Sequence, residues 1–221
     1  MGCECNKLDD ENVEVRAEDS PIKDLEKDKD ILYRQNNNNL SSRSNNSKPA
    51  DSFSRYIFEQ INALRENPQS FIDIIEKAKS HITIDEKTGI QIYKTSVKVA
   101  LNNGESAFDE AIDTLKNTEP MEKLQFNPDF VVDLPTNELD VKSKEYLMDQ
   151  VKIKIDSGID IKSFWKDIVS DAESCFILTV VDDSGLDDGN KRMDILNKDN
   201  KYIGISTVRI GRSFACYIVI G

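Results

Sequence analysis

The end of the chain constrains the fold most, because it predicts a β-hairpin that is apolar on both faces. Two β-rich segments, residues 201–208 and 213–220, are joined through Gly211. The second segment alternates two apolar sets, Phe214, Cys216, Ile218 and Ile220 on one face and Ala215, Tyr217 and Val219 on the other. A strand with two apolar faces is covered on both sides, so we expect this hairpin to lie inside a layered domain.

The composition indicates one globular domain and a tail. The chain has 221 residues, of which 38% are hydrophobic and 32% charged, and this balance is typical of a soluble globular protein. It contains no run of 18 apolar residues, so no membrane-spanning helix is predicted. The formal charge of −12 argues against nucleic-acid binding and against electrostatic attachment to anionic lipid, because both partners require basic clusters.

The first six residues carry a pattern of lipid attachment. Gly2 is the acceptor for N-myristoylation, and the thiols of Cys3 and Cys5 lie where a myristoyl chain would hold them at the membrane for palmitoylation. Asn6 departs from the pattern, which has Ser or Thr at that position. No apolar stretch of a secretory signal follows, so we expect acyl anchoring at the cytoplasmic face of a membrane and no secretion. The alternative is an ordinary disordered start in which glycine happens to follow methionine.

The composition of the chain changes after its first fifty residues. Residues 1–50 are rich in Asn and Ser and in mixed charges, and we expect an acylated, disordered tail there. Residues 51–221 form the domain, because every strongly periodic apolar segment lies in this range. A predicted hairpin and a helix that stops before Pro120 occupy about residues 88–118, which we interpret as an insertion.

Capping residues and prolines place two of the helices. The first opens at Asp51 or Ser52, both good N-cap residues, and carries an apolar stripe at helical spacing. Asn67-Pro68 ends or kinks it, because the residue before a proline leaves the α region. Asn127 is predicted to cap a second helix that has a proline in its first turn.

Three further helices are predicted before the C-terminal hairpin. One runs over about residues 137–158, and a short amphipathic helix follows it. The apolar stripe of that short helix is formed by Ile161, Phe164, Trp165 and Ile168. Trp165 is interpreted as a core anchor, with a pocket wall as the alternative. Ser170 and Glu173 form a capping box, which favours a buried helix over a strand for residues 175–181.

Several short motifs occur in a family-like order. Before and within the last hairpin come Asp182 and Asp183, Arg192, residues 195–197 (Ile-Leu-Asn) and residues 202–205 (Tyr-Ile-Gly-Ile). Residues 61–68 add an Asn, an Arg and a following Pro on the first helix. Residues 124–130 add the start of the second helix. Together these stretches resemble the CAP superfamily, the SCP-like domain of cysteine-rich secretory and plant pathogenesis-related proteins. The resemblance covers roughly residues 51–221, discontinuously, and implies an α+β fold. Its architecture would be an α-β-α sandwich, with a small antiparallel sheet covered by helices on both faces.

The resemblance also implies where a cleft would lie. CAP members that keep the full set line this cleft with two histidines and two acidic residues, which can hold a divalent metal. Here Lys191 stands in place of the second histidine, and neither the first histidine nor the Gly-Glu-Asn strand is found. A protonated lysine does not bind zinc, so no metal is expected. Lys191 could instead pair with Asp194 or Glu173, and the alternative is a solvated lysine at a helix N-terminus. The candidate cleft residues are Lys191, Arg192, Asp194, Glu173 and Trp165.

Other chemistry is not predicted. His81 is the only histidine and is interpreted as a surface residue at a helix end, so no catalytic triad or Cys–His pair is predicted. The acidic stretch of residues 182–190 lacks the spacing of an EF-hand and is interpreted as a surface loop, with weak binding of a divalent cation as the alternative. Cys175 and Cys216 are expected to be reduced thiols in the core. No cofactor is expected.

These observations leave three hypotheses of function. The first is a membrane-tethered, non-catalytic CAP-like module that binds an unknown protein or lipid partner and no nucleic acid. The second is a hydrolase with a rearranged acidic site, which metal-dependent turnover would distinguish. The third is a module that binds a sterol or a fatty acid, which an exposed apolar patch would favour.

Overall fold

The computed structural model describes residues 48–96, 98–134, 144–154, 159–183 and 190–221. The chain divides into two units at residues 45 and 46. Gly2, Cys3 and Cys5 lie outside the described residues, and the description below concerns the second unit only. In the described part of the chain, no helix is long and apolar enough to cross a membrane.

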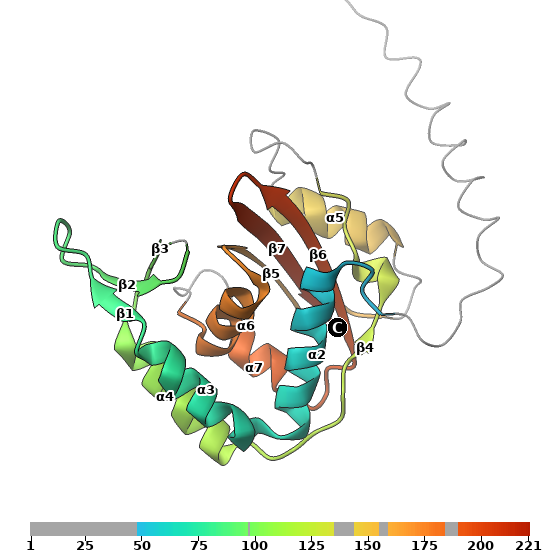
Figure 1. The fold of residues 1–221 in the computed structure, drawn as a ribbon. Helices are drawn as coiled ribbons and strands as arrows, with labels where there is room; N and C mark the ends of the chain where they lie inside the picture. The colour runs from blue at the N-terminus through green and yellow to red at the C-terminus, as the bar shows by residue number, and fades with distance from the viewer. Residues whose placement is uncertain (1–47, 97, 135–143, 155–158, 184–189) are drawn as a thin grey trace, which may run out of the picture. The chain divides into compact units, whose positions relative to one another are not determined.

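The predicted C-terminal hairpin forms the centre of a four-stranded sheet (Figure 1). Its strands are β6 (Tyr202–Ile210) and β7 (Ser213–Ile220), which pair antiparallel. Gly211 forms the turn with a φ of 60°, a backbone conformation that glycine adopts without steric cost. The sheet has the order β4-β6-β7-β5, with β4 (Gln125–Phe126) beside β6 and β5 (Ser163–Val169) beside β7.

The prediction that both faces of this hairpin are covered is confirmed. One face of β7 packs in the larger core cluster against α2 (Ser52–Glu66) and α6 (Ala172–Val181). The other face packs in a second cluster that contains Leu147 and Val151 of α5 (Lys144–Lys154). The domain is therefore α+β, with helices on both faces of its main sheet. The sheet is mixed and not purely antiparallel as expected, because β4 runs parallel to β6.

The first helix, α2, begins and ends where the sequence predicts. The side chain of Asp51 caps it by accepting a hydrogen bond from the Ser54 N–H at 2.8 Å. The helix ends at Glu66, one residue before Asn67-Pro68, and the chain continues through the 3₁₀ turn η2 (Pro68–Phe71) into α3 (Ile72–Lys79). The apolar stripe Ile57, Ile61 and Leu64 is fully buried.

The region of about residues 88–118 contains the predicted hairpin and helix. Its strands β2 (Gln91–Lys94) and β3 (Lys98–Ala100) pair antiparallel, and β1 (Ile82–Ile84) adds a third strand on the other side of β2. The helix is α4 (Glu105–Asn117), whose buried side chains are Ala107, Phe108, Ala111, Ile112 and Leu115. These side chains belong to the larger core cluster, so the region packs against the domain's main core.

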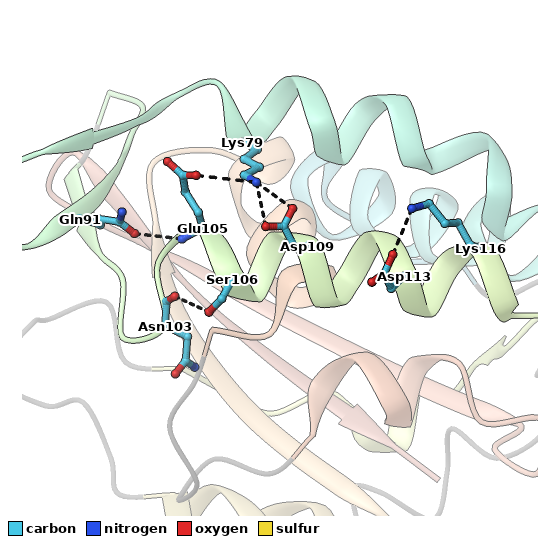
Figure 2. Close-up of polar contacts among 8 residues, drawn as sticks. All are labelled: Lys79, Gln91, Asn103, Glu105, Ser106, Asp109, Asp113 and Lys116. Carbon is cyan, nitrogen blue, oxygen red and sulfur yellow. Dashed lines mark hydrogen bonds and ion pairs between the residues drawn. The ribbon is translucent and has the colours of Figure 1, made fainter.

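Polar contacts fix the start of α4, as Figure 2 shows. Lys79 at the end of α3 binds the Asp109 carboxylate at 2.7 Å and lies 3.7 Å from that of Glu105. The Gln91 side chain accepts a hydrogen bond from the Glu105 N–H at 2.9 Å, so a strand residue caps the helix. Gly104, at φ 61°, precedes this N–H, and a Cβ there would lie 1.7 Å from the Gln91 oxygen. Glycine adopts this positive φ without steric cost and leaves room for the Gln91 side chain.

Two predictions between residues 159 and 181 need correction. The segment expected as a short amphipathic helix is strand β5, which pairs with β7 over all seven of its residues. Adjacent residues Phe164 and Trp165 are both buried, one in each core cluster, which is possible only when side chains alternate between two faces. The helix after it, α6, is confirmed, but Asp171 and not Ser170 is its N-cap, because the Asp171 side chain accepts from the Ser174 N–H.

The helix expected after Asn127 is a single 3₁₀ turn, η3 (Pro128–Phe130). Asn127 caps it as predicted by accepting from the Asp129 N–H at 3.0 Å. The helix predicted over about residues 137–158 corresponds to α5, and residues 137–143 and 155–158 of that prediction lie outside the described residues.

Candidate functional site

Three of the five candidate cleft residues lie on one short helix, α7 (Lys191–Ile195). The side chain of Asn190 caps this helix by accepting a hydrogen bond from the Met193 N–H at 3.1 Å. Lys191 and Arg192 are buried, Asp194 is half-buried, and Met193 is exposed at the surface. The helix therefore directs both of its cations into the domain.

Lys191 forms a buried ion pair with Asp167 of β5. Its Nζ lies 2.6 Å from Asp167 Oδ1, and the two side chains are 5% and 14% exposed. The predicted partners, Asp194 and Glu173, are wrong. The register of β5 explains the difference, because Asp167 lies on the same face of the strand as Trp165, toward the larger core cluster. The short helix predicted for this segment would not place Asp167 on the same face as Trp165.

Two buried thiols lie beside this ion pair. Cys175 of α6 and Cys216 of β7 are free, as expected, and Cys216 is the β7 residue that pairs with Asp167. A hydrogen bond with the Cys216 thiol and then burial raise the pKa of Cys175 well above its usual range, and Asp167 raises it further while Lys191 opposes the shift. Cys175 is therefore a protonated thiol at neutral pH, which is a poor nucleophile. We call Asp167, Cys175, Lys191 and Cys216 the polar core cluster.

Arg192 caps the C-terminal end of α6. Its Nη1 donates to the carbonyl of Val181 at 2.7 Å and to that of Val180 at 3.4 Å, which are among the last carbonyls of that helix. Its Nη2 lies 3.7 Å from Glu110, whose side chain is largely exposed. Burial lowers the pKa of Arg192. This guanidinium is thus held by backbone carbonyls within the domain.

The remaining candidates do not join these groups. Trp165 is fully buried in the larger core cluster, which confirms it as a core anchor. Glu173 is exposed in the first turn of α6, and its charge acts on Tyr56 and Tyr93. Burial raises the pKa of Asp194, and a hydrogen bond with the Ser163 side chain opposes the shift. The five residues therefore do not line one common cleft.

Two shallow hollows border α7. Arg192 and Met193 line one of about 580 Å³ against α4, and Met193 and Asp194 line another of about 570 Å³. Among the described residues, no group of three or more His, Cys, Asp or Glu side chains is placed to hold a metal ion. His81 is exposed after the end of α3, as predicted for a surface histidine.

Asp183 corrects the expectation of an acidic surface loop. Its carboxylate is buried and accepts hydrogen bonds from the backbone N–H groups of Asn102 and Asn103 at 2.5 and 2.6 Å. Burial raises the pKa of Asp183, although these amide donors work against the shift. The carboxylate thus ties the loop before α4 to the end of α6. Residues 184–189 of the predicted loop lie outside the described residues.

Arg65 organises the backbone around α7, a role that was not predicted from the sequence. Its side chain is fully buried on α2 and donates to four carbonyl groups, those of Glu122 at 2.6 Å, Ile195 at 2.6 Å, Asn197 at 3.0 Å and Asn200 at 3.3 Å. Burial lowers the pKa of Arg65 to about 10, so it stays protonated at neutral pH. Asn62, one turn earlier, exchanges two hydrogen bonds with the backbone of Leu124. Polar residues one turn apart on an otherwise apolar helix face were the available signal.

The buried Tyr93 gives a prediction on pH. Burial, with help from the charges of Glu173 and Asp171, raises the pKa of Tyr93 to about 12, whereas an unfolded chain has a tyrosine pKa of about 10. Because the folded state favours the protonated phenol, its contribution is fully present below about pH 10 and is lost as the pH rises toward about 12. Between these pH values the free energy of unfolding should fall more steeply in the natural protein than in Tyr93→Phe, by up to about 3 kcal/mol. Parallel pH profiles in urea unfolding would contradict this.

Comparison with protein-family models, with curated protein sequences and with solved structures gives no match. The resemblance to the CAP superfamily therefore stays a prediction from the sequence.

Proposed function

We propose that this protein is a membrane-tethered, non-catalytic binding module with a CAP-like fold. The observation that carries the proposal is the buried pair of Lys191 and Asp167, at the position where the resemblance places a cleft histidine. A cation that is 5% exposed and held by a carboxylate serves packing, and it presents no group to a ligand. Arg192 is likewise occupied by the carbonyls of α6. The partner is then bound elsewhere on the domain.

The packing of the family-like motifs supports the CAP-like part of the proposal. Arg65, in the motif of the first helix, donates to the carbonyls of Ile195 and Asn197 in the Ile-Leu-Asn motif. Asn62 holds Leu124, which opens another matched stretch. The motifs are far apart in sequence, yet side chains of the first motif form direct hydrogen bonds with the backbone of the others. A shared structural role of this kind is a physical reason for such residues to occur together.

A hydrolase is the second candidate, and Asp194 is the observation that favours it. This carboxyl lines one of the hollows beside α7, and burial raises its pKa, which is the property of a general acid. Turnover of ester or peptide substrates that is lost in Asp194→Asn, with the folded state intact, would support this candidate over the binding module.

The tether is tested by replacing Gly2. With N-myristoyltransferase present, the full chain should fractionate with membranes, and Gly2→Ala should move it to the soluble fraction, because the myristoyl chain must precede palmitoylation. A variant with Cys3→Ser and Cys5→Ser keeps one acyl chain, which gives only marginal binding, so it should distribute between the two fractions. Labelling with an alkyne fatty acid checks each modification. Equal membrane retention of Gly2→Ala and the natural protein would overturn the tether.

A further inference from the structure

A groove runs along one edge of the main sheet, and we call it the edge groove. Its volume is about 640 Å³. It is lined by Lys48, Pro49, Ala50 and Asp51, by Phe126, Pro128 and residues 131–134, and by Ile205, Ser206, Thr207 and Val208 of β6. Successive side chains of a strand point to opposite faces of a sheet. Four consecutive residues of β6 can therefore line one groove only if that groove follows the edge of the strand.

The hydrogen bonds of β6 show which backbone groups face the edge groove. Tyr202 and Gly221 exchange both backbone hydrogen bonds, at 2.7 and 3.0 Å, so every second residue from Tyr202 onward bonds to β7. The residues between them, Ile205, Thr207 and Arg209, direct their N–H and C=O groups to the other side. The edge therefore presents three N–H donors and three C=O acceptors, one of each from these three residues.

The neighbouring strand leaves this part of β6 uncovered. β4 pairs only with Tyr202 and Ile203, and the N–H of Asn127 makes the last backbone bond, to the carbonyl of Ile203 at 2.8 Å. From there the chain turns away through η3. Within the described residues, no backbone hydrogen bond reaches Ile205, Thr207 or Arg209 from this side. Such an edge is a template for one more strand.

The edge groove has two walls, residues 48–51 and residues 131–134, and a hydrogen bond fixes each wall to β6. The Thr207 hydroxyl donates to the Asp51 carboxylate at 3.2 Å on one face, and the Ser206 hydroxyl accepts from the Val132 N–H at 2.8 Å on the other. The first turn of α2 lies beside β6 (Figure 1). The edge is therefore recessed between two walls. A second copy of the chain would bring its own walls against these, whereas a single extended segment fits between them.

The side chains of the edge groove define the chemistry of an occupant. Phe126, Val131 and Leu134 give it an apolar lining, and Asp51 and Asp133 place two carboxylates along it. Among the lining residues that the structure describes, the one cation is Lys48, which lies 3.5 Å from Glu59 in an ion pair, and the chain as a whole carries −12. Apolar side chains on one face of a bound strand and basic side chains near the carboxylates would complement this lining.

We propose that the edge groove binds an extended segment of a partner protein, with alternating apolar and basic residues, by addition of a strand to the edge of β6. The proposal rests on the proposed function as a binding module and names its class of partner. Main-chain hydrogen bonds to Ile205, Thr207 and Arg209 provide affinity, and the walls select the side chains.

The first test uses the full chain and a fluorescein-labelled hexapeptide of alternating valine and lysine. Fluorescence anisotropy should give a Kd on the order of 100 µM, which is ordinary for so short a segment. N-methylation of alternate peptide amides removes the donors to β6 on one edge of the peptide and should weaken binding by more than about tenfold, whereas methylation of the other set should not. Glutamate in place of lysine should also weaken binding. Equal binding of the two methylated peptides would overturn strand addition.

The second test locates the peptide on the protein. Saturating peptide should slow the amide exchange of Thr207 and Arg209 at least tenfold and leave that of residues in α4 unchanged. Arg209→Pro removes an edge donor without removing a bond to β7 and should weaken binding, whereas Arg209→Ala keeps the donor and is the matched control. Unchanged exchange of Thr207 would overturn the proposal even if Arg209→Pro failed to fold.

A lipid in the edge groove is a separate outcome of the same assay. Two results together would assign the groove to an acyl chain and overturn strand addition. Dodecanoate would displace the peptide, and the peptide would not slow the amide exchange of Thr207. If the protein does not bind the peptide but Gly2→Ala still moves to the soluble fraction, only the proposal for the edge groove is overturned. Retention of Gly2→Ala on membranes with intact peptide binding would instead overturn the tether.

Discussion

Lys191→Met should destabilise the domain by about 3–5 kcal/mol, because it leaves the Asp167 carboxylate in the core without its cation. The methionine has a similar length and fills the space of the lysine stem, so lost packing contributes little. The pair is 5% and 14% exposed, and water can replace the ammonium only by entering the larger core cluster. Urea unfolding of the natural and variant proteins measures the difference.

A second variant separates the charge from the packing. Combined Lys191→Met and Asp167→Leu should recover most of the lost stability, because replacement of a whole buried pair by apolar residues is often neutral or stabilising. Lys116→Met is the matched control, since Lys116 pairs with Asp113 at 3.0 Å but both side chains are more than half exposed, and it should cost less than about 1 kcal/mol. A cost below about 1 kcal/mol for Lys191→Met alone would contradict the importance of the pair.

The fold was predictable wherever local patterns and packing agree. The C-terminal hairpin combines strict alternation with a glycine turn, and α2 combines an N-cap, an apolar stripe and a proline boundary. The β5 segment gave the wrong prediction because Phe164, Trp165 and Ile168 satisfy helical spacing as well as they satisfy a strand. Seven pairs with β7 decided the outcome, and a contact with residues 214–220 is not a local property.

The same error hid the candidate site. Lys191 was identified from the order of motifs, but its partner Asp167 lies 24 residues earlier on a strand that was expected to be a helix. The edge groove could not be predicted from the sequence either, because it depends on where β4 stops pairing with β6. Propensity describes a strand, but it does not say which of its edges a neighbour leaves open.

Arg65→Met should cost about 3–5 kcal/mol, because it leaves four buried or half-buried carbonyl groups without their donor. The lost bonds join α2 to two separate segments, residue 122 before β4 and residues 195–200, which run from the end of α7 toward β6. In a domain of this size the cost corresponds to a fall of roughly 10 °C in Tm. Thermal and urea unfolding give two independent measurements.

Arg65→Lys distinguishes the hydrogen bonds from the charge. Lysine keeps the cation but cannot reproduce the planar fork of five donors, so it should recover only part of the lost stability. Native-state amide exchange should then speed up in residues 195–203 and 122–127, whereas α4, to which the Arg65 side chain donates none of these hydrogen bonds, keeps its protection. Arg55→Met is the control on the same helix, since Arg55 is exposed and, among the described residues, bonds only the carbonyls of Pro49 and Ala50. Equal costs for Arg55→Met and Arg65→Met would show that the buried network does not stabilise the domain.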